Sequence, residues 1–232
     1  MIPPVFTASR NGFAFLNSWP SEPAVSITTP FGPINIGNAE AGLCGGMVYA
    51  AMDYWYAGGS CPKSQPAPAS ALYKFLVHRI IDSWNVPTGV TQYYTWMSLP
   101  DADSTFDFFG HRIPAERGVS SRTVTQQWPQ VKHDIDTGIP SPLGIVTVKS
   151  SAIGDLGHNH QVLACAYATD DSVVTLNVYD PNRGQRDDVS IRFDTANPER
   201  GNTFTHNLGI NEPVRGFFRS SYSPTPVPPS AA

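Results

Sequence analysis

The amino-acid sequence predicts an α+β protein in which helices fill the first half of the chain and an antiparallel sheet fills the second. Apolar residues in the first half recur at the spacing of one buried helix face. The second half instead contains short runs rich in β-branched and aromatic residues, each bounded by Gly, Pro, Asn or Asp. Helices that precede strands, rather than alternate with them, are typical of the α+β class.

The first half is expected to contain extended chain followed by three helices. Residues 1–40 are rich in Pro, Gly, Ser and Asn, which predicts irregular chain packed on the body. Apolar residues at helical spacing predict one helix over 43–57 and a second over 69–84. A third helix is expected over 129–137, with Pro in its first turn. Residues 86–120 show no pattern that indicates a particular element.

Five runs in the second half predict strands of an antiparallel sheet. They span residues 143–148, 160–168, 173–179, 189–193 and 214–219. Asp170 and Asp171 stand between the second and third runs and predict a hairpin turn. Residues 220–232 are rich in Ser, Pro and Ala and are predicted to be a disordered tail. Residues 1–219 are then expected to form a single domain with two lobes.

Size and composition allow a sizeable core and argue against two classes of partner. The chain has 232 residues, of which 41% are hydrophobic and 15% are charged. Its net charge is -4, so we expect no nucleic-acid partner, because phosphate binding depends on excess Lys and Arg. No segment approaches the roughly 20 apolar residues that span a bilayer, and no signal peptide is seen. We therefore expect no membrane partner and, by default, a cytoplasmic location; the sequence does not indicate an oligomeric state.

The three cysteines are too few, and odd in number, for a disulfide framework. Cys165 lies in an apolar, strand-like run and is predicted to be a buried structural thiol. Cys61 lies in a loop with no partner that the sequence indicates. Cys44 has a different context, which suggests chemistry.

Cys44 stands where an irregular segment becomes a helix, in the string Gly-Leu-Cys-Gly-Gly-Met. Unpaired N–H groups and the positive end of the helix dipole stabilise a thiolate there, and the same N–H groups can hold an oxyanion. Gly45 and Gly46 leave room for a substrate backbone, at a cost of up to about 1 kcal/mol each in helix propensity. The ordinary alternative is a buried cysteine at a tight junction between loop and helix.

Two further residues suit the proton transfers that a thiol nucleophile needs. His160 opens an apolar strand, from which its ring can project towards a helix N-terminus and act as base and acid. Asp180 ends the next predicted strand, so a hairpin would bring its carboxylate beside His160 to orient the ring. Asn182 is the fallback for that orienting role, and Asn159 is a further candidate to contact substrate. The ordinary alternatives are a loop histidine and an Asp-Pro turn.

Cys44-Gly45, His160-Gln161-Val162-Leu163 and Asp180-Pro181, in this order along the chain, resemble the papain-like cysteine peptidase superfamily, and within it the C39-like group. They also resemble a group of uncharacterised bacterial proteins with this predicted fold. The resemblance covers the candidate catalytic segments and their spacing, about half of the chain. It implies a papain-like fold, with a helical N-terminal half on an antiparallel C-terminal half and the active site between them.

The resemblance also implies a reaction. A Cys44–His160–Asp180 triad would hydrolyse a peptide or amide substrate through a thioester acyl-enzyme, without a cofactor or metal. Members of the family usually carry a Gln six residues before the nucleophile as an oxyanion-hole donor, and here that position is Asn38. Asn38 is shorter by one methylene, so the backbone N–H of Cys44 is expected to carry more of the oxyanion hole.

Other functions stay open on the sequence alone. A catalytically degenerate papain fold could serve as a binding or interaction module, and the same triad could support an acyltransferase or transglutaminase-type reaction. His158 and His160 could instead share one metal with Cys44 or Asp180, although no Cys-x-x-Cys or His-x-x-x-His pattern supports a zinc site. The identity of the substrate cannot be read from the chain.

Overall fold

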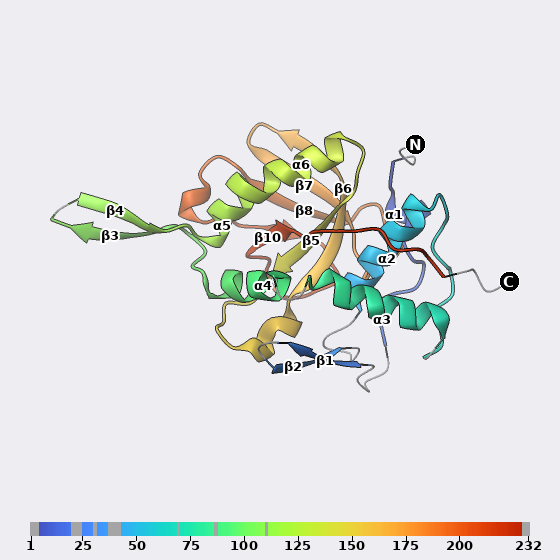
Figure 1. Cartoon of the computed structure of the whole chain (residues 1–232). Coiled ribbons are helices and arrows are strands. Elements are labelled where there is room, and N and C mark those ends of the chain that lie inside the picture. The colour runs from blue at the N-terminus through green and yellow to red at the C-terminus, as the bar shows by residue number, and fades with distance from the viewer. Residues whose placement is uncertain are drawn as a thin grey trace.

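The computed structural model describes residues 5–19, 25–29, 32–36, 43–68, 70–85, 88–109 and 111–228. Within them the protein is a mixed α+β fold with a curled antiparallel sheet (Figure 1), as the sequence predicts. The helices are α1 (Ala8–Asn11), α2 (Cys44–Tyr56), α3 (Ala71–Ser83), α4 (Thr88–Ser98), α5 (Val119–Arg122) and α6 (Trp128–Asp136), with the π-helix η1 (Thr123–Gln127) and the 3-10 helices η2 (Ile153–His158) and η3 (Pro198–Arg200). The strands are β1 (Val25–Thr29), β2 (Gly32–Ile36), β3 (Ser104–Phe108), β4 (His111–Glu116), β5 (Ser141–Val146), β6 (His160–Asp170), β7 (Val173–Tyr179), β8 (Ser190–Asp194), β9 (Thr205–His206) and β10 (Gly216–Arg219).

The main sheet has six strands in the order β10-β5-β6-β7-β8-β9, and every neighbouring pair is antiparallel. β6 and β7 form the hairpin that the sequence predicts. Asp171 lies in its turn with a φ of 49°, a left-handed conformation that Asp tolerates better than most residues. Leu163 pairs with Tyr179, so the start of β6 and the end of β7 lie at the same end of the sheet.

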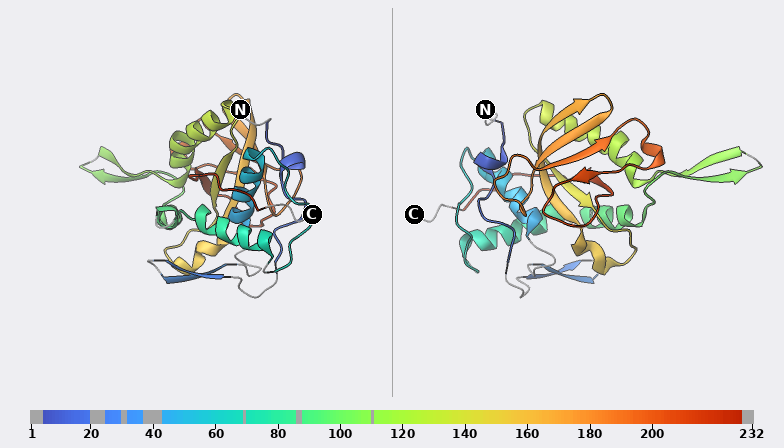
Figure 2. Two further views of the ribbon diagram at one scale, coloured as in Figure 1. Left: turned by 45° about the vertical axis from the view of Figure 1, so that its right-hand side comes forward. Right: turned by 180° about the vertical axis from the view of Figure 1, so that it is seen from behind.

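Alternate residues of the sheet enter two hydrophobic clusters on its opposite faces, as the two-residue period of a strand requires. Leu163 packs with the cluster that includes α2, α3 and α4. Val162 and Ala164 pack with the other cluster, to which α6 contributes Trp128. Helices therefore cover the sheet from both sides (Figure 2).

The two helices predicted near the start of the chain are confirmed. α2 is buried from Gly45 to Trp55, because α3 packs along it and β6 lies beside it. α3 begins after Ser70, whose side chain accepts a hydrogen bond from the Tyr73 N–H at 3.2 Å and so caps the helix.

Other stretches hold more regular structure than the sequence indicates. β1 and β2 pair in a segment expected to be irregular. The third predicted helix is longer than expected, because α5 and the π-helix η1 precede α6 without a break. Pro129 lacks the N–H that would bond to the carbonyl of Thr125, and the wider π turn directly before it accommodates that loss. β3 and β4 form a two-stranded ribbon that projects from the body (Figure 1).

The C-terminal segment differs from the prediction of a disordered tail. Residues 220–228 are described and pack on α2 and α3, while 229–232 lie outside the described residues. The Tyr222 hydroxyl and the Thr225 N–H donate to Oδ1 of Asp53 at 2.7 and 2.9 Å. The Ser- and Pro-rich composition did not reveal these contacts, because they answer a charge buried far away in the sequence.

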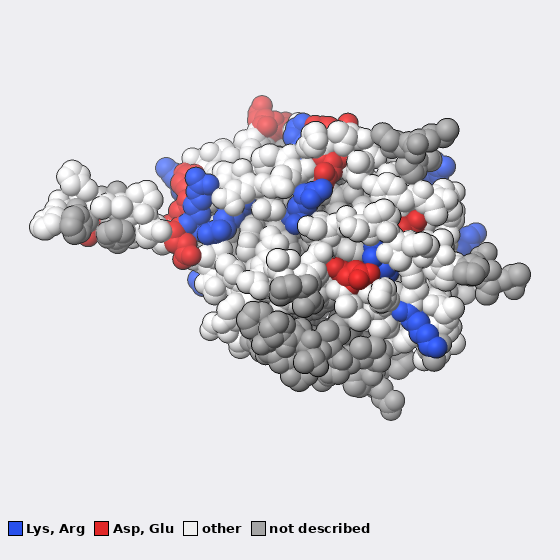
Figure 3. Space-filling model, viewed as in Figure 1, with Lys and Arg blue, Asp and Glu red and all other residues white. Residues whose placement is uncertain are grey.

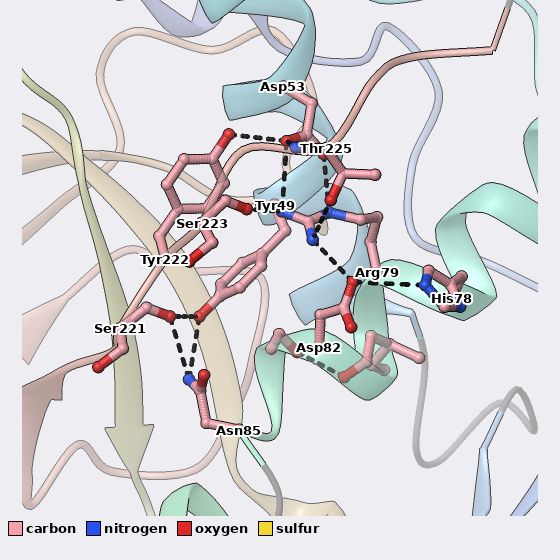
Figure 4. Close-up of polar contacts among 12 residues, drawn as sticks. Tyr49, Asp53, His78, Arg79, Asp82, Asn85, Ser221, Tyr222, Ser223 and Thr225 are labelled. Atoms are coloured by element: carbon pink, nitrogen blue, oxygen red, sulfur yellow. Dashed lines mark hydrogen bonds and ion pairs between the residues drawn. The ribbon is translucent and has the colours of Figure 1, made fainter.

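That charge belongs to an ion pair between α2 and α3 (Figure 4). Asp53 and Arg79 are each 2% exposed, and Arg79 Nε lies 2.7 Å from Asp53 Oδ2. Arg79 also donates to Asp82 Oδ2 at 2.7 Å and to the Ser223 carbonyl at 2.9 Å. Burial raises the pKa of Asp53, while these donors oppose that shift. The C-terminal segment thus helps to satisfy a pair of buried charges. Among the described helices, none is long and apolar enough to cross a membrane.

Asp53→Asn is expected to destabilise the fold by about 3–5 kcal/mol, because it leaves the buried Arg79 without its buried counter-charge. Asp188→Asn is the matched control, since it removes the partner of Arg186 in an exposed ion pair and should leave the unfolding midpoint unchanged. Urea unfolding followed by circular dichroism measures both variants. An Asp53→Asn protein as stable as the wild type would contradict this role.

Candidate active site

Cys44 is the first residue of α2 and is half-buried. The first hydrogen bond within the helix runs from the Met47 N–H to the Leu43 carbonyl at 2.9 Å. The N–H groups of the first turn, including that of Cys44, therefore have no partner inside the helix and point out of its end. The structure places the thiol where the sequence analysis expects it, at a helix N-terminus.

Gly45 and Gly46 are needed for the packing of α2 rather than for an open cleft. A Cβ on Gly45 would lie 2.3 Å from Ser83 Oγ and 2.5 Å from Gln161 Oε1. A Cβ on Gly46 would lie 2.2 Å from the Leu76 carbonyl oxygen of α3. Because the protein itself fills the space beside both glycines, they let α3 and β6 approach the start of α2 closely.

His160 and Asp180 meet at the end of the β6–β7 hairpin. His160 Nε2 lies 2.8 Å from Asp180 Oδ1, and the two residues are 4% and 0% exposed. The carboxylate also accepts the Asn182 N–H at 2.8 Å and the Gly209 N–H at 2.7 Å. A buried carboxylate needs such donors, because taking it out of water without them is costly.

Burial and pairing act in opposite directions on the two partners. Burial alone would raise the pKa of Asp180, but the charge of His160 and the three hydrogen bonds hold that pKa below its ordinary value. Burial alone would lower the pKa of His160, but Asp180 and a hydrogen bond with the Cys44 side chain raise it to about 10. Since Nε2 faces Asp180, Nδ1 is the ring nitrogen left for Cys44. Thiol, imidazole and carboxylate therefore form one hydrogen-bonded series.

The remaining predicted site residues have different positions. The Asn182 side chain does not orient His160: it accepts from Asn17 Nδ2 at 3.0 Å and donates to the Gly209 carbonyl at 3.1 Å, and only its backbone contacts Asp180. The Asn159 side chain is engaged with its own loop and with the Thr147 N–H at 3.1 Å. Asn38, the expected oxyanion donor, lies outside the described residues.

Asn17 ties the two halves of the site together and was not foreseen. Its Oδ1 accepts the Leu43 N–H at 2.7 Å, directly before the nucleophile, and its Nδ2 donates to Asn182, directly after the Asp-Pro turn. An isolated Asn in a Pro- and Gly-rich stretch gives no signal of such a role. The Gly209 N–H was missed for the same reason, because its partner is 29 residues away in the sequence.

The other thiols do not resemble Cys44. Cys61 is buried, donates to the Asn11 carbonyl at 3.0 Å, and has a pKa raised well above its ordinary value by burial. Burial likewise raises the pKa of Cys165 to about 12. Within the described residues, no three His, Cys, Asp or Glu side chains form a group that could hold a metal, so the arrangement of His158 and His160 with Cys44 or Asp180 is not a metal site.

A small pocket of about 10 Å³ adjoins Cys44, enough for one water-sized group. Its walls include Trp84, Tyr93, Asn159 and Gln161. On the face of the molecule shown in Figure 3, Lys and Arg are scattered among Asp and Glu and form no basic stripe.

No protein-family model, curated protein or solved structure matches this chain. Its chemistry is therefore argued from the geometry of the site.

The His160 ring is expected to titrate near pH 10 in the wild type and at a lower pH in Asp180→Asn. The folded-state pKa lies above the unfolded value of about 6.5, so the stability contributed by the pair is complete below pH 6.5 and is lost as the pH rises towards 10. Histidine ring NMR signals followed against pH measure the midpoint, with the other histidines as internal controls. A wild-type midpoint near 6.5 would rule out the pairing described.

Proposed function

We propose that this chain is a cysteine-dependent hydrolase of the papain-like type, C39-like in its motifs, that acts on a peptide or amide. The observation that supports the proposal is the hydrogen-bonded series from Cys44 through His160 to Asp180. The three residues come from a helix start, a strand start and a strand end, and two of them are almost fully buried. A buried ionisable pair that ends at a half-buried thiol is an arrangement with a chemical use.

In the proposed mechanism, His160 takes the proton of Cys44 and the sulfur attacks the carbonyl carbon of the substrate. The C–N bond then breaks, and His160 returns the proton to the leaving nitrogen. Water attacks the resulting thioester with His160 as base, which releases the acid and restores the thiol. Asp180 holds the ring in place and favours its charged form, because the raised pKa keeps the imidazolium populated at neutral pH.

The oxyanion would be held at the start of α2. The Cys44 N–H has no partner within the helix and lies beside the sulfur, which suits an oxyanion donor. Asn38 is the second proposed donor, on the strength of its position six residues before Cys44.

A second candidate is a papain-like binding or interaction module without catalytic activity. The observation that favours it is the narrow pocket beside Cys44, which at about 10 Å³ admits one small group. The paired Cys44 and His160 side chains favour the hydrolase.

Cys44 is expected to react with iodoacetamide at pH 6 at least about tenfold faster than glutathione, because an imidazolium partner stabilises its thiolate. His160→Ala should return the rate to that of glutathione, and Cys44→Ala should abolish modification of this peptide. Peptide mass spectrometry reads the site of labelling.

Cys165→Ala is the matched control and should label at Cys44 at the wild-type rate, since that thiol is held protonated by burial. If wild-type Cys44 reacts no faster than glutathione, and His160→Ala leaves its rate unchanged, the hydrolase proposal fails and the interaction module takes its place.

A further inference from the structure

Two polar atoms of residues lining the pocket beside Cys44 are buried and have no hydrogen-bond partner among the described residues. Gln161 Oε1 is an acceptor, and the Trp84 Nε1–H is a donor. The two residues are 4% and 8% exposed. Buried polar atoms without a partner are rare in folded proteins and reduce stability. Their position beside the proposed nucleophile suggests that a ligand supplies the missing partners.

The rest of the pocket does not share this property. The Tyr93 hydroxyl donates to the His160 carbonyl at 3.1 Å, and Asn159 bonds to its own loop. Gln161 follows the proposed catalytic histidine directly, and its Oε1 lies against Gly45, the residue after the nucleophile. The unsatisfied acceptor is thus held within one residue of each proposed reacting group along the chain.

An orphan donor and an orphan acceptor on one small pocket complement a group that carries the opposite pair. An amide is such a group, because its oxygen accepts and its N–H donates. An ester or a thioester has the oxygen but no N–H, so it would leave Gln161 unsatisfied, and sites that discriminate in this way do so strongly. The pocket volume suits one small polar group rather than a side chain.

We propose that Gln161 and Trp84 are specificity-determining residues that bind the substrate amide at Cys44 and select amides over esters. The inference rests on the proposed function and names its substrate class. The Trp84 N–H donates to the amide oxygen, and Gln161 Oε1 accepts the hydrogen that the amide nitrogen already carries. His160 supplies the further proton that this nitrogen needs when the C–N bond breaks and the S–C bond has formed.

Three small thiol reagents test the inference without a known substrate. Chloroacetamide carries a carbonyl and an NH₂ group. Chloroacetone has the same carbonyl, with an isosteric methyl group in place of NH₂. Methyl methanethiosulfonate has no carbonyl, so its rate reports the reactivity of the sulfur alone. Each rate at Cys44 is measured by peptide mass spectrometry and divided by the rate of glutathione with the same reagent.

Gln161→Met is expected to lower the chloroacetamide rate about 3- to 10-fold relative to the chloroacetone rate, because it removes one hydrogen-bond acceptor at nearly constant volume. Trp84→Phe should lower both carbonyl reagents by a similar factor relative to methyl methanethiosulfonate. Gln130→Met is the matched control, since Gln130 is exposed on α6, and it should match the wild type for all three reagents.

An unchanged ratio of chloroacetamide to chloroacetone in Gln161→Met would overturn the inference, and so would a pocket that only holds a water, because it yields that same result. The Gln161→Met variant keeps the test valid if Trp84→Phe fails to fold, since loss of an unsatisfied buried amide should not destabilise the protein. Failure of the proposed function has a separate signature, namely a methyl methanethiosulfonate rate at Cys44 no higher than that of glutathione.

Discussion

The candidate site depends on one fully buried carboxylate. Asp180 accepts hydrogen bonds from the His160 ring and from the N–H groups of Asn182 and Gly209, so strand β6, the loop after β7 and the chain before β10 all meet at it. A buried charge tolerates little rearrangement, because each lost donor leaves part of its desolvation uncompensated. The charge therefore constrains the end of the sheet and, through the imidazole, the direction in which His160 faces α2.

The nucleophile is constrained from the other side. α2 carries Cys44 at its first residue and Asp53 near its last, and both ends are tied down. The Asn17 side chain holds the N–H of Leu43 at one end, while Arg79 and the C-terminal segment hold Asp53 at the other. A helix fixed at both ends presents its first residue with little freedom to move, which a hydrogen bond between a thiol and a ring requires.

Local patterns predicted much of this architecture. The helical spacing of apolar residues located α2 and α3, and β-branched runs with polar turns located the hairpin of β6 and β7, so His160 and Asp180 could be expected at one sheet end. Contacts between distant segments were not predictable. Asn17, Gly209 and Tyr222 look ordinary in the sequence, and their partners lie 26, 29 and 169 residues away. The role of Asn182 was misjudged for a related reason, because only its backbone, which any residue supplies, reaches the carboxylate.

The clamp on Asp53 has a consequence for the order of events on the ribosome. Arg79 is synthesised 144 residues before Ser223, whose carbonyl it binds. At about 5–20 residues per second, α2 and α3 spend roughly 7–30 s with their charge pair only partly satisfied. During that interval water must solvate the groups that the later segment covers. The nucleophile is thus held by a helix that reaches its final packing only after nearly all of this sequence has been translated, which delays a reactive thiol until the surrounding fold is in place.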